Sequence, residues 1–122
     1  MRVNLKPCSV NRAWQGRRFK TNDYKDFEKG MLLLIKNTPL MAQKDYGIYL
    51  KFHLKNVVAS DLSNFIKTTE DIIVKAGIVK DDRYCWRMLV DKFRSESDYL
   101  EFDIIELVPE ERIDIWKLQK SC

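Results

Sequence analysis

Residues 59–82 read ASDLSNFIKTTEDIIVKAGIVKDD, and this stretch predicts the central helix of the fold. Its apolar residues recur every three or four positions, which places them along one face of a helix over residues 62–76. Asp61 stands at the N-cap position, and Gly77 stands where a left-handed C-cap belongs. The apolar face comprises Leu62, Phe65, Ile66, Thr69, Ile72, Ile73 and Ala76, and the other side carries Asn64, Lys67, Asp71 and Lys75.

The clearest strand precedes this helix and is predicted over Tyr46–Lys55. Apolar and polar side chains alternate along it, as expected for a strand with one buried face. The core face is expected to carry Ile48, Leu50, Phe52 and Leu54, and the other, basic and aromatic face carries Tyr49, Lys51, His53 and Lys55.

The remaining elements complete a β-α-β-α-β-β order in a single α+β domain over residues 1–122. This order predicts a mixed sheet with its two main helices packed on one face. A polar turn of hairpin length, Arg94–Asp98, joins the last two strands. The other predicted segments are a strand over Val3–Lys6, a loop over Ser9–Gly16, an extended run over Arg17–Lys20, a helix from Thr21 or Asn22 to about Asn37 with Tyr24, Phe27, Met31 and Leu34 on its core face, strands over Tyr84–Phe93 and Tyr99–Glu106, and a tail after Pro109 in which Glu110–Lys120 forms a short helix.

Composition excludes several protein classes. Hydrophobic residues make up 45% of the 122 residues and charged residues 33%, which are ordinary values for a globular domain. The longest apolar run, Met31–Ile35, is too short to span a bilayer, so we expect no membrane association. The start of the chain lacks the pattern of a signal peptide, which predicts a cytoplasmic protein. The three cysteines and single histidine show no zinc-binding spacing, whereas a site built from carboxylates stays open.

Positive charge is concentrated at the N-terminal end. Every charged residue before Asp23 is basic, although the net charge of the chain is only +4. Clustered cations favour a polyanionic partner such as nucleic acid, because they displace counterions from phosphates. A basic surface segment that serves only solubility is an equally open interpretation. The residues concerned are Arg2, Lys6, Arg12, Arg17, Arg18 and Lys20.

The acids at the two ends of the central stretch have two interpretations. Asp61 is a good helix cap, and Asp81–Asp82 suit a solvated turn. Alternatively, these carboxylates hold a divalent metal for phosphodiester hydrolysis, with Lys67 as an additional positive charge. A helix over residues 62–76 is about 22 Å long, and the four residues from Gly77 to Asp81 return at most about 14 Å. The two acidic groups of one chain therefore meet only if the helix is shorter or bent, or if a dimer mate supplies one of them.

Three motifs together resemble the RusA family of Holliday junction resolvases, which are crossover junction endodeoxyribonucleases. They are P-x-S-x-N-x-x-W at residues 7–14, D-L-x-N-x-x-K at residues 61–67 and K-A-G-x-x-x-D-D at residues 75–82. The resemblance covers about residues 3–107 and leaves the tail from residue 109 outside.

The resemblance implies a homodimeric, Mg²⁺-dependent endonuclease, often prophage-encoded, that binds four-way DNA junctions and acts in recombination and repair. Mn²⁺ would substitute for Mg²⁺. Carried over residue by residue, it implies that Asp61, Lys67 and Asp82 are catalytic and that Asp61, Asp81 and Asp82 bind the metal. The implied DNA-contacting residues are Asn11, Arg12, Arg17, Arg18, Lys20 and Asn64.

One position departs from the family motif. The family has D-L-D-N, and this chain has D-L-S-N, with Ser63 in place of the second aspartate. A serine hydroxyl can ligate Mg²⁺ but brings no charge, so the affinity for metal is expected to fall. This leaves an alternative function, a catalytically weakened or inactive junction-binding protein with the same fold.

Overall fold

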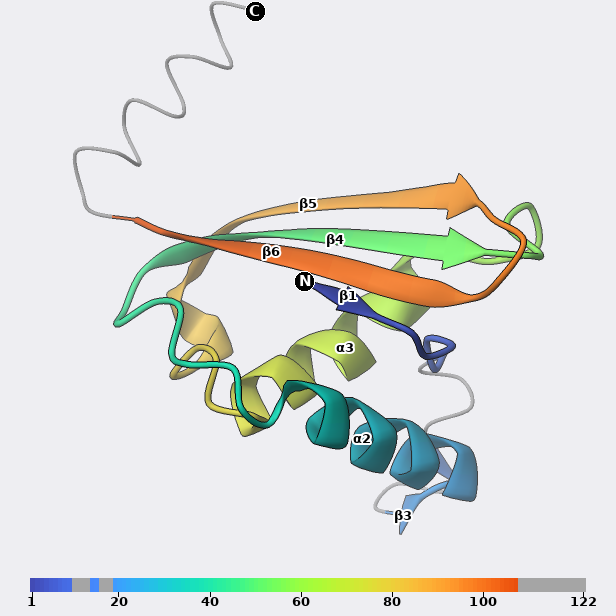
Figure 1. Cartoon of the computed structure of the whole chain (residues 1–122), viewed down its shortest axis with the longest axis horizontal. Helices are drawn as coiled ribbons and strands as arrows, with labels where there is room; N and C mark the ends of the chain where they lie inside the picture. Colours follow the sequence, from blue (N-terminus) through green and yellow to red (C-terminus); the bar gives the residue numbers. More distant parts are fainter. Residues whose placement is uncertain (10–13, 16–18, 108–122) are drawn as a thin grey trace, which may run out of the picture.

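The computed structural model describes residues 1–9, 14–15 and 19–107, and within them a mixed sheet of four strands carries both helices on one face (Figure 1). The α+β class and the β-α-β-α-β-β order of the main elements are confirmed. A further pair of two-residue strands, one of them inside the predicted loop, precedes the first helix. The elements are β1 (Arg2–Val3), β2 (Trp14–Gln15), β3 (Phe19–Lys20), α2 (Asn22–Ile35), β4 (Tyr46–Leu54), α3 (Ser63–Lys75), the 3₁₀ turn η1 (Asp82–Tyr84), β5 (Cys85–Arg94) and β6 (Tyr99–Glu106).

The order of strands in the main sheet is β1-β6-β4-β5, so the predicted hairpin between the last two strands is wrong. β4 lies between them, parallel to β5 and antiparallel to β6. The reason is the helix α3, which connects β4 to β5 and so allows the parallel pairing that a tight turn cannot make. β6 then returns along the free side of β4.

The link over residues 95–98 is held at the end of β4. The Ser95 amide donates to the carbonyl oxygen of Leu54 at 3.1 Å. The Lys55 amide donates to Asp98 Oδ1 at 2.9 Å. Polar groups of the link thus satisfy the last backbone groups of β4, which explains how a short connection passes from one side of that strand to the other.

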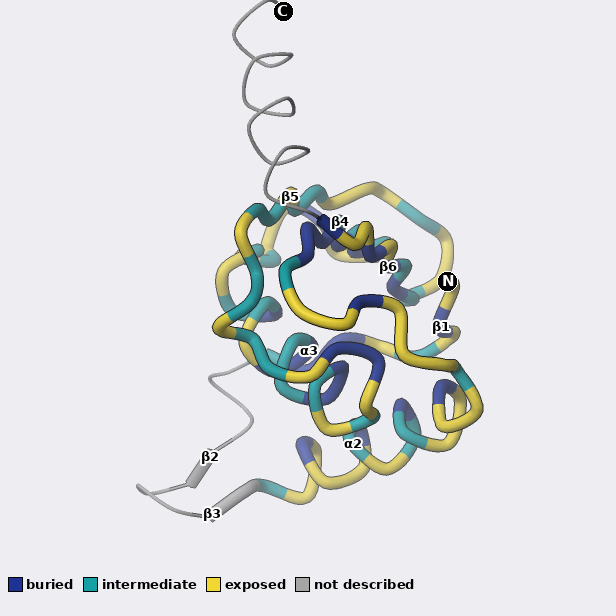
Figure 2. Tube along the Cα trace, turned by 90° about the vertical axis from the view of Figure 1, so that its left-hand side faces the viewer, coloured by how far each residue is buried: buried dark blue, intermediate teal, exposed yellow. Residues whose placement is uncertain are grey.

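The core lies between the sheet and the two helices (Figure 2). The predicted inward face of β4 is confirmed, because Ile48, Leu50, Phe52 and Leu54 are all buried. On α2 the prediction is wrong at its last position, since Ile35 is buried and Leu34 is 57% exposed. The buried residues of α2 are Tyr24, Phe27, Met31 and Ile35, a spacing that keeps the helical period over three turns.

Helix α3 follows the predicted pattern and ends as expected. Gly77 has a φ of +78°, and the Ile78 amide donates back to the Ile73 carbonyl at 3.3 Å, as in a Schellman C-cap. Thr68 is buried although it was outside the predicted apolar face. Its Oγ1 donates to the carbonyl oxygen of Cys8 at 2.6 Å, which joins the N-terminal segment to the helix.

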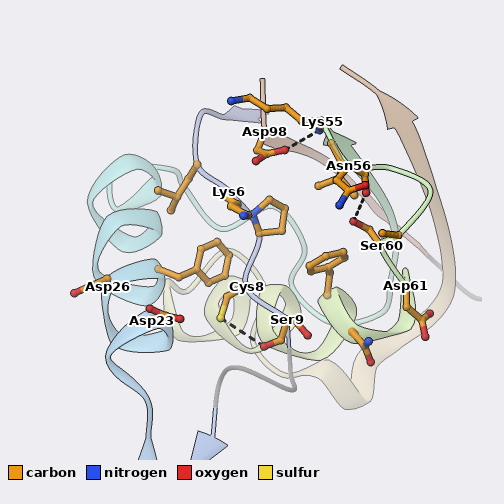
Figure 3. A pocket seen from close by; sticks show the side chains of 17 residues that line it. Lys6, Cys8, Ser9, Asp23, Asp26, Lys55, Asn56, Ser60, Asp61 and Asp98 are labelled. Atoms are coloured by element: carbon orange, nitrogen blue, oxygen red, sulfur yellow. Dashed lines mark hydrogen bonds between the residues drawn. The ribbon is translucent and has the colours of Figure 1, made fainter. Parts of the chain in front are cut away.

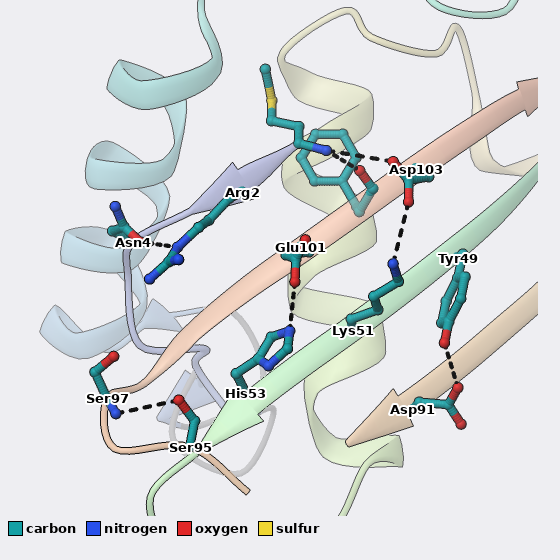
Figure 4. A network of polar contacts seen from close by, with 12 residues as sticks. Arg2, Asn4, Tyr49, Lys51, His53, Asp91, Ser95, Ser97, Glu101 and Asp103 are labelled. Atoms are coloured by element: carbon teal, nitrogen blue, oxygen red, sulfur yellow. Dashed lines mark hydrogen bonds and ion pairs between the residues drawn. The ribbon is translucent and has the colours of Figure 1, made fainter. Parts of the chain in front are cut away.

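The sheet face opposite the helices carries a network of polar and aromatic contacts (Figure 4). Tyr49 Oη donates to Asp91 Oδ2 at 2.6 Å, and His53 Nε2 lies 2.7 Å from Glu101 Oε1. The His53 ring stacks on Tyr99 at a centroid distance of 4.1 Å. His53 is therefore a polar-face strand residue, as its position in the alternation predicts.

The remaining sequence predictions differ from the structure mainly in length. The first strand comprises only Arg2–Val3, because the Leu5 amide already turns back to the Val3 carbonyl at 2.9 Å. β4 ends at Leu54, and β5 is shifted by one residue from the prediction. The predicted tail helix lies outside the described residues.

Candidate functional site

Lys67, on the exposed side of α3, contacts two carboxylates. Its Nζ lies 3.0 Å from Asp71 Oδ1, one turn further along the same helix. It also lies 3.2 Å from Asp82 Oδ2, in the 3₁₀ turn that leads into β5. The ion pair with Asp82 connects the middle of α3 to the acidic turn at residues 81–82. One of the predicted catalytic acids therefore lies beside the predicted catalytic lysine.

The charges of this cluster act on one another. Hydrogen bonds to Asp71 and then to Asp82 raise the pKa of Lys67, so its side chain stays cationic at physiological pH. Burial raises the pKa of the neighbouring Glu70, and the negative charge of Asp82 raises it further. A cationic Lys67 therefore lies in the same cluster as Glu70, whose carboxyl group is harder to ionise than that of an ordinary glutamate.

Asp81 starts the 3₁₀ turn rather than pointing at Lys67. Its Oδ1 accepts from the Arg83 amide at 3.0 Å, and its Oδ2 lies 3.9 Å from Arg83 Nε. The amide hydrogen bond is the main reason why the pKa of Asp81 is lowered. Asp81 is thus held as a carboxylate next to Asp82 in the sequence.

Asp61 and Asn64 line a different feature, an open hollow of about 800 Å³. Asp61 lies on the β4–α3 side of the hollow, across from Asp23 and Asp26 of α2 (Figure 3). The N-terminal segment over residues 5–9 forms part of its wall. The lining carries both acids and bases, with Lys6, Lys55, Asp23, Asp26, Asp61 and Asp98 as its charged residues.

The Asp61 carboxylate is oriented by the start of α3. Asp61 Oδ1 accepts from the Ser63 amide at 3.3 Å and from Ser63 Oγ at 3.0 Å. Leu62 already has helical backbone angles and offers no side-chain cap, so Asp61 supplies the capping hydrogen bond. Ser63, which replaces the second aspartate of the motif, thus holds the first one in place.

The three predicted metal ligands do not converge in one chain. Among the described residues, no group of three or more His, Cys, Asp or Glu side chains is arranged to hold a metal ion. Their chemistry suits Mg²⁺, which prefers carboxylate oxygens. The donor type therefore fits, while Asp61 lines the hollow and the pair Asp81–Asp82 lies outside its lining, with Asp82 beside Lys67.

Most predicted DNA contacts cannot be placed. Asn11, Arg12, Arg17 and Arg18 lie outside the described residues, and for Lys20 only the backbone, in β3, is described. The chain leaves the wall of the hollow at Ser9 and returns to it at Asp23. The basic segment between them is therefore attached at both ends to the hollow that Asp61 and Asn64 also line.

Sequence reasoning missed part of the hollow. Asp23, Asp26 and Asp98 come from two elements far apart in sequence, and each has an ordinary position in a helix turn or a link. The sequence did contain one indication of the position of Asp98, because this residue ends the polar link that crosses the end of β4. Placing it beside the hollow requires the correct order of strands, and the predicted order was wrong.

Comparison with known proteins identifies one family. A family model described as "Endodeoxyribonuclease RusA" matches residues 6–105. No curated protein matches the chain. Within the described part of the chain, no helix has the length and apolar character needed to cross a membrane.

Proposed function

The chain belongs to the RusA family of endodeoxyribonucleases, and we propose that it is a Mg²⁺-dependent enzyme that resolves four-way (Holliday) DNA junctions in recombination and repair. One observation carries the proposal. Lys67, at the lysine position of the family motif, is paired with Asp82, at the distal acid position, although a helix end and a loop separate them in sequence. This contact supports a common role for the two side chains at one site.

The proposed catalytic residues are Asp61, Lys67 and Asp82. Lys67 is 60% exposed, so its ammonium group is accessible to a DNA phosphate as well as paired with acids. A permanent positive charge at this point would stabilise the charge that develops on a phosphodiester during cleavage. Asp61, Asp81 and Asp82 would hold the metal, which when bound supplies an activated water and offsets phosphate charge.

We propose that the active form is a homodimer in which the acidic groups of two protomers complete each metal site. The separation of Asp61 from the pair Asp81–Asp82 in one protomer supports this. A second support is the sheet face that the helices leave uncovered, where Leu89 is 45% exposed and Ile105 is 63% exposed. Exposed apolar side chains on one face are typical of a protein interface.

The basic segment is the proposed DNA-binding element, with Asn11, Arg12, Arg17, Arg18 and Lys20 at the junction backbone and Asn64 beside the hollow. Both ends of this segment are attached at the hollow that contains Asp61. Each phosphate contact should contribute about 0.9 to the slope of log affinity against log salt. Replacing Arg17 and Arg18 by Ala should therefore weaken junction binding and reduce that slope by about 1.8 if both contact phosphates.

A second candidate function is favoured by Ser63. Its hydroxyl donates to Asp61 Oδ1, so the position offers a neutral hydroxyl where the family motif has a carboxylate. A weakened metal site would leave a protein that binds junctions but cleaves them slowly or not at all.

A two-step assay separates the two functions. The protein is first bound to a synthetic four-way junction in EDTA, with linear duplex as the control, and Mg²⁺ or Mn²⁺ is then added. Binding in EDTA followed by paired nicks on adding metal supports the nuclease. Binding without nicks at any metal concentration supports a junction-binding protein that lacks nuclease activity. Equal affinity for the junction and for linear duplex contradicts both candidate functions.

A further inference from the structure

Asp71 is an acid to which the family motif assigns no role, and it lies directly beside Lys67. Its Oδ1 is 3.0 Å from Lys67 Nζ, slightly closer than Asp82 Oδ2 at 3.2 Å. The side chains of Asp71 and Asp82 are each 37% exposed, so burial in the core does not explain the position of either carboxylate. Lys67 is therefore held between one acid on its own helix and one acid on the neighbouring turn.

A long, exposed lysine has many rotamers, and fixing one of them costs conformational entropy. In a protomer without bound metal, the ion pair with Asp82 would be enough to fix the Lys67 side chain. If Asp82 is a metal ligand, however, a bound cation competes with Lys67 for the same carboxylate and repels the ammonium group. Asp71 then offers a second carboxylate, one helical turn away, that keeps Lys67 beside the site.

We propose that Asp71 is a positioning residue that keeps the Lys67 ammonium group directed at the reacting phosphate while Asp82 binds metal. The inference rests on the proposed nuclease function and deepens it. Asp71 contacts neither DNA nor metal in this role. Its effect acts through Lys67, so removing Asp71 should have little consequence once Lys67 is gone.

A matched control exists on the same helix. Lys75 Nζ lies 2.8 Å from Glu28 Oε1, so α3 carries a second lysine–carboxylate pair away from the proposed site. Glu28→Gln removes a carboxylate from that pair, as Asp71→Asn does from the first. Comparing the two variants separates the general effect of removing an ion pair from α3 from the specific effect of releasing the Lys67 side chain.

The test is a double-mutant cycle in junction cleavage with Asp71→Asn, Lys67→Ala, the double variant and Glu28→Gln. Asp71→Asn should lower kcat about 10- to 100-fold and leave KM for the junction unchanged. In the Lys67→Ala background the same change should have no further effect, and Glu28→Gln should leave kcat as in the wild type. Asp71→Glu should restore part of the lost kcat, because it returns the carboxylate.

A second measurement does not need cleavage. Hydrogen bonds slow proton exchange at a lysine ammonium group, so the ¹⁵N signal of Lys67 should be visible in the wild type with and without Mg²⁺. In Asp71→Asn it should be visible without Mg²⁺, where Asp82 still pairs with Lys67, and lost when Mg²⁺ is added. Glu28→Gln should leave that signal unchanged. If the wild type does not cleave the junction, the proposed function is wrong. If Lys67→Ala cleaves like the wild type, the nuclease function stands, and the role of Lys67 is overturned together with the inference about Asp71. If Lys67→Ala is inactive while Asp71→Asn keeps full kcat, or if the Lys67 signal persists in Asp71→Asn with Mg²⁺ present, the inference about Asp71 is overturned.

Discussion

Lys67 Nζ and Asp82 Oδ2 lie 3.2 Å apart, although 15 positions of sequence separate the two residues. Chain geometry explains the contact. From Lys67 to Lys75 the helix advances about 12 Å. The residues from Gly77 to Asp81, when extended, are long enough to run back over that distance. They cannot return to the start of the helix, where Asp61 lies. The same geometry thus joins Asp82 to Lys67 and leaves Asp61 apart.

The hydrogen bond from Thr68 to Cys8 should be important for stability. Thr68→Val removes the hydroxyl that donates to the Cys8 carbonyl at 2.6 Å and leaves that acceptor without this partner. We expect a loss of about 1–3 kcal/mol in the free energy of unfolding. Urea denaturation measures it.

Thr69→Val is the matched control, because Thr69 is equally buried and its Oγ1 has no hydrogen-bond partner among the described residues. Its free energy of unfolding should stay equal or rise, since an unsatisfied hydroxyl is replaced by a methyl group. Equal losses in both variants would show that the Thr68 hydrogen bond is not the cause.

Glu70 should make stability depend on pH. Its pKa is raised in the folded state, mainly by burial, so its contribution to stability is present below the unfolded pKa and is lost as pH rises through the folded pKa. Glu70→Gln should therefore be more stable than the wild type at neutral pH. The difference should shrink on acidification towards about pH 4, near the ordinary pKa of glutamate.

Thermal unfolding at several pH values measures this difference. Glu96→Gln, which changes an exposed acid in the link between β5 and β6, is measured alongside as the control. A Glu70→Gln variant less stable than the wild type at neutral pH would contradict the proposed effect of burial.

Gly77 should resist substitution for a backbone reason alone. Its φ of +78° lies in the left-handed region, and an added Cβ would meet nothing within 4 Å. Gly77→Ala should cost about 1–2 kcal/mol of folding free energy, whereas Gly77→Asn should cost less, since Asn tolerates this region. Denaturant midpoints compare the two variants, and an Ala variant as stable as the wild type would refute the C-cap assignment.

Ser63→Asp should strengthen the metal site. The change restores the charge of the family motif beside Asp61, although it also removes the hydroxyl that donates to Asp61 Oδ1. We expect half-maximal cleavage at a lower Mg²⁺ concentration than in the wild type. Ser63→Ala, which removes the hydroxyl and adds no charge, should not produce this shift, and a metal requirement unchanged by Ser63→Asp would show that Ser63 does not weaken the site.

The sequence predicted those features that depend on local spacing. Alternation in β4, the apolar face of α3 and the left-handed Gly77 all follow from neighbouring residues. The order of strands could not be predicted in this way, because it depends on which side of β4 remains free after α3 has brought β5 alongside.

The candidate site shows the same limit. Motif spacing selected Lys67 and Asp82, and the structure brings them together. The hydrogen bond between Ser63 and Asp61 and the acids across the hollow depend on tertiary placement that no local pattern records.

The most direct test of the central claim is junction cleavage by the wild type and by Asp61→Asn in a series of Mg²⁺ and Mn²⁺ concentrations. We predict that the wild type introduces paired nicks in a four-way junction only when metal is present. We also predict that Asp61→Asn binds the junction equally well in EDTA and cleaves it at least about 100-fold more slowly. Equal cleavage by Asp61→Asn and the wild type would contradict the assignment of Asp61, and with it the proposed metal site.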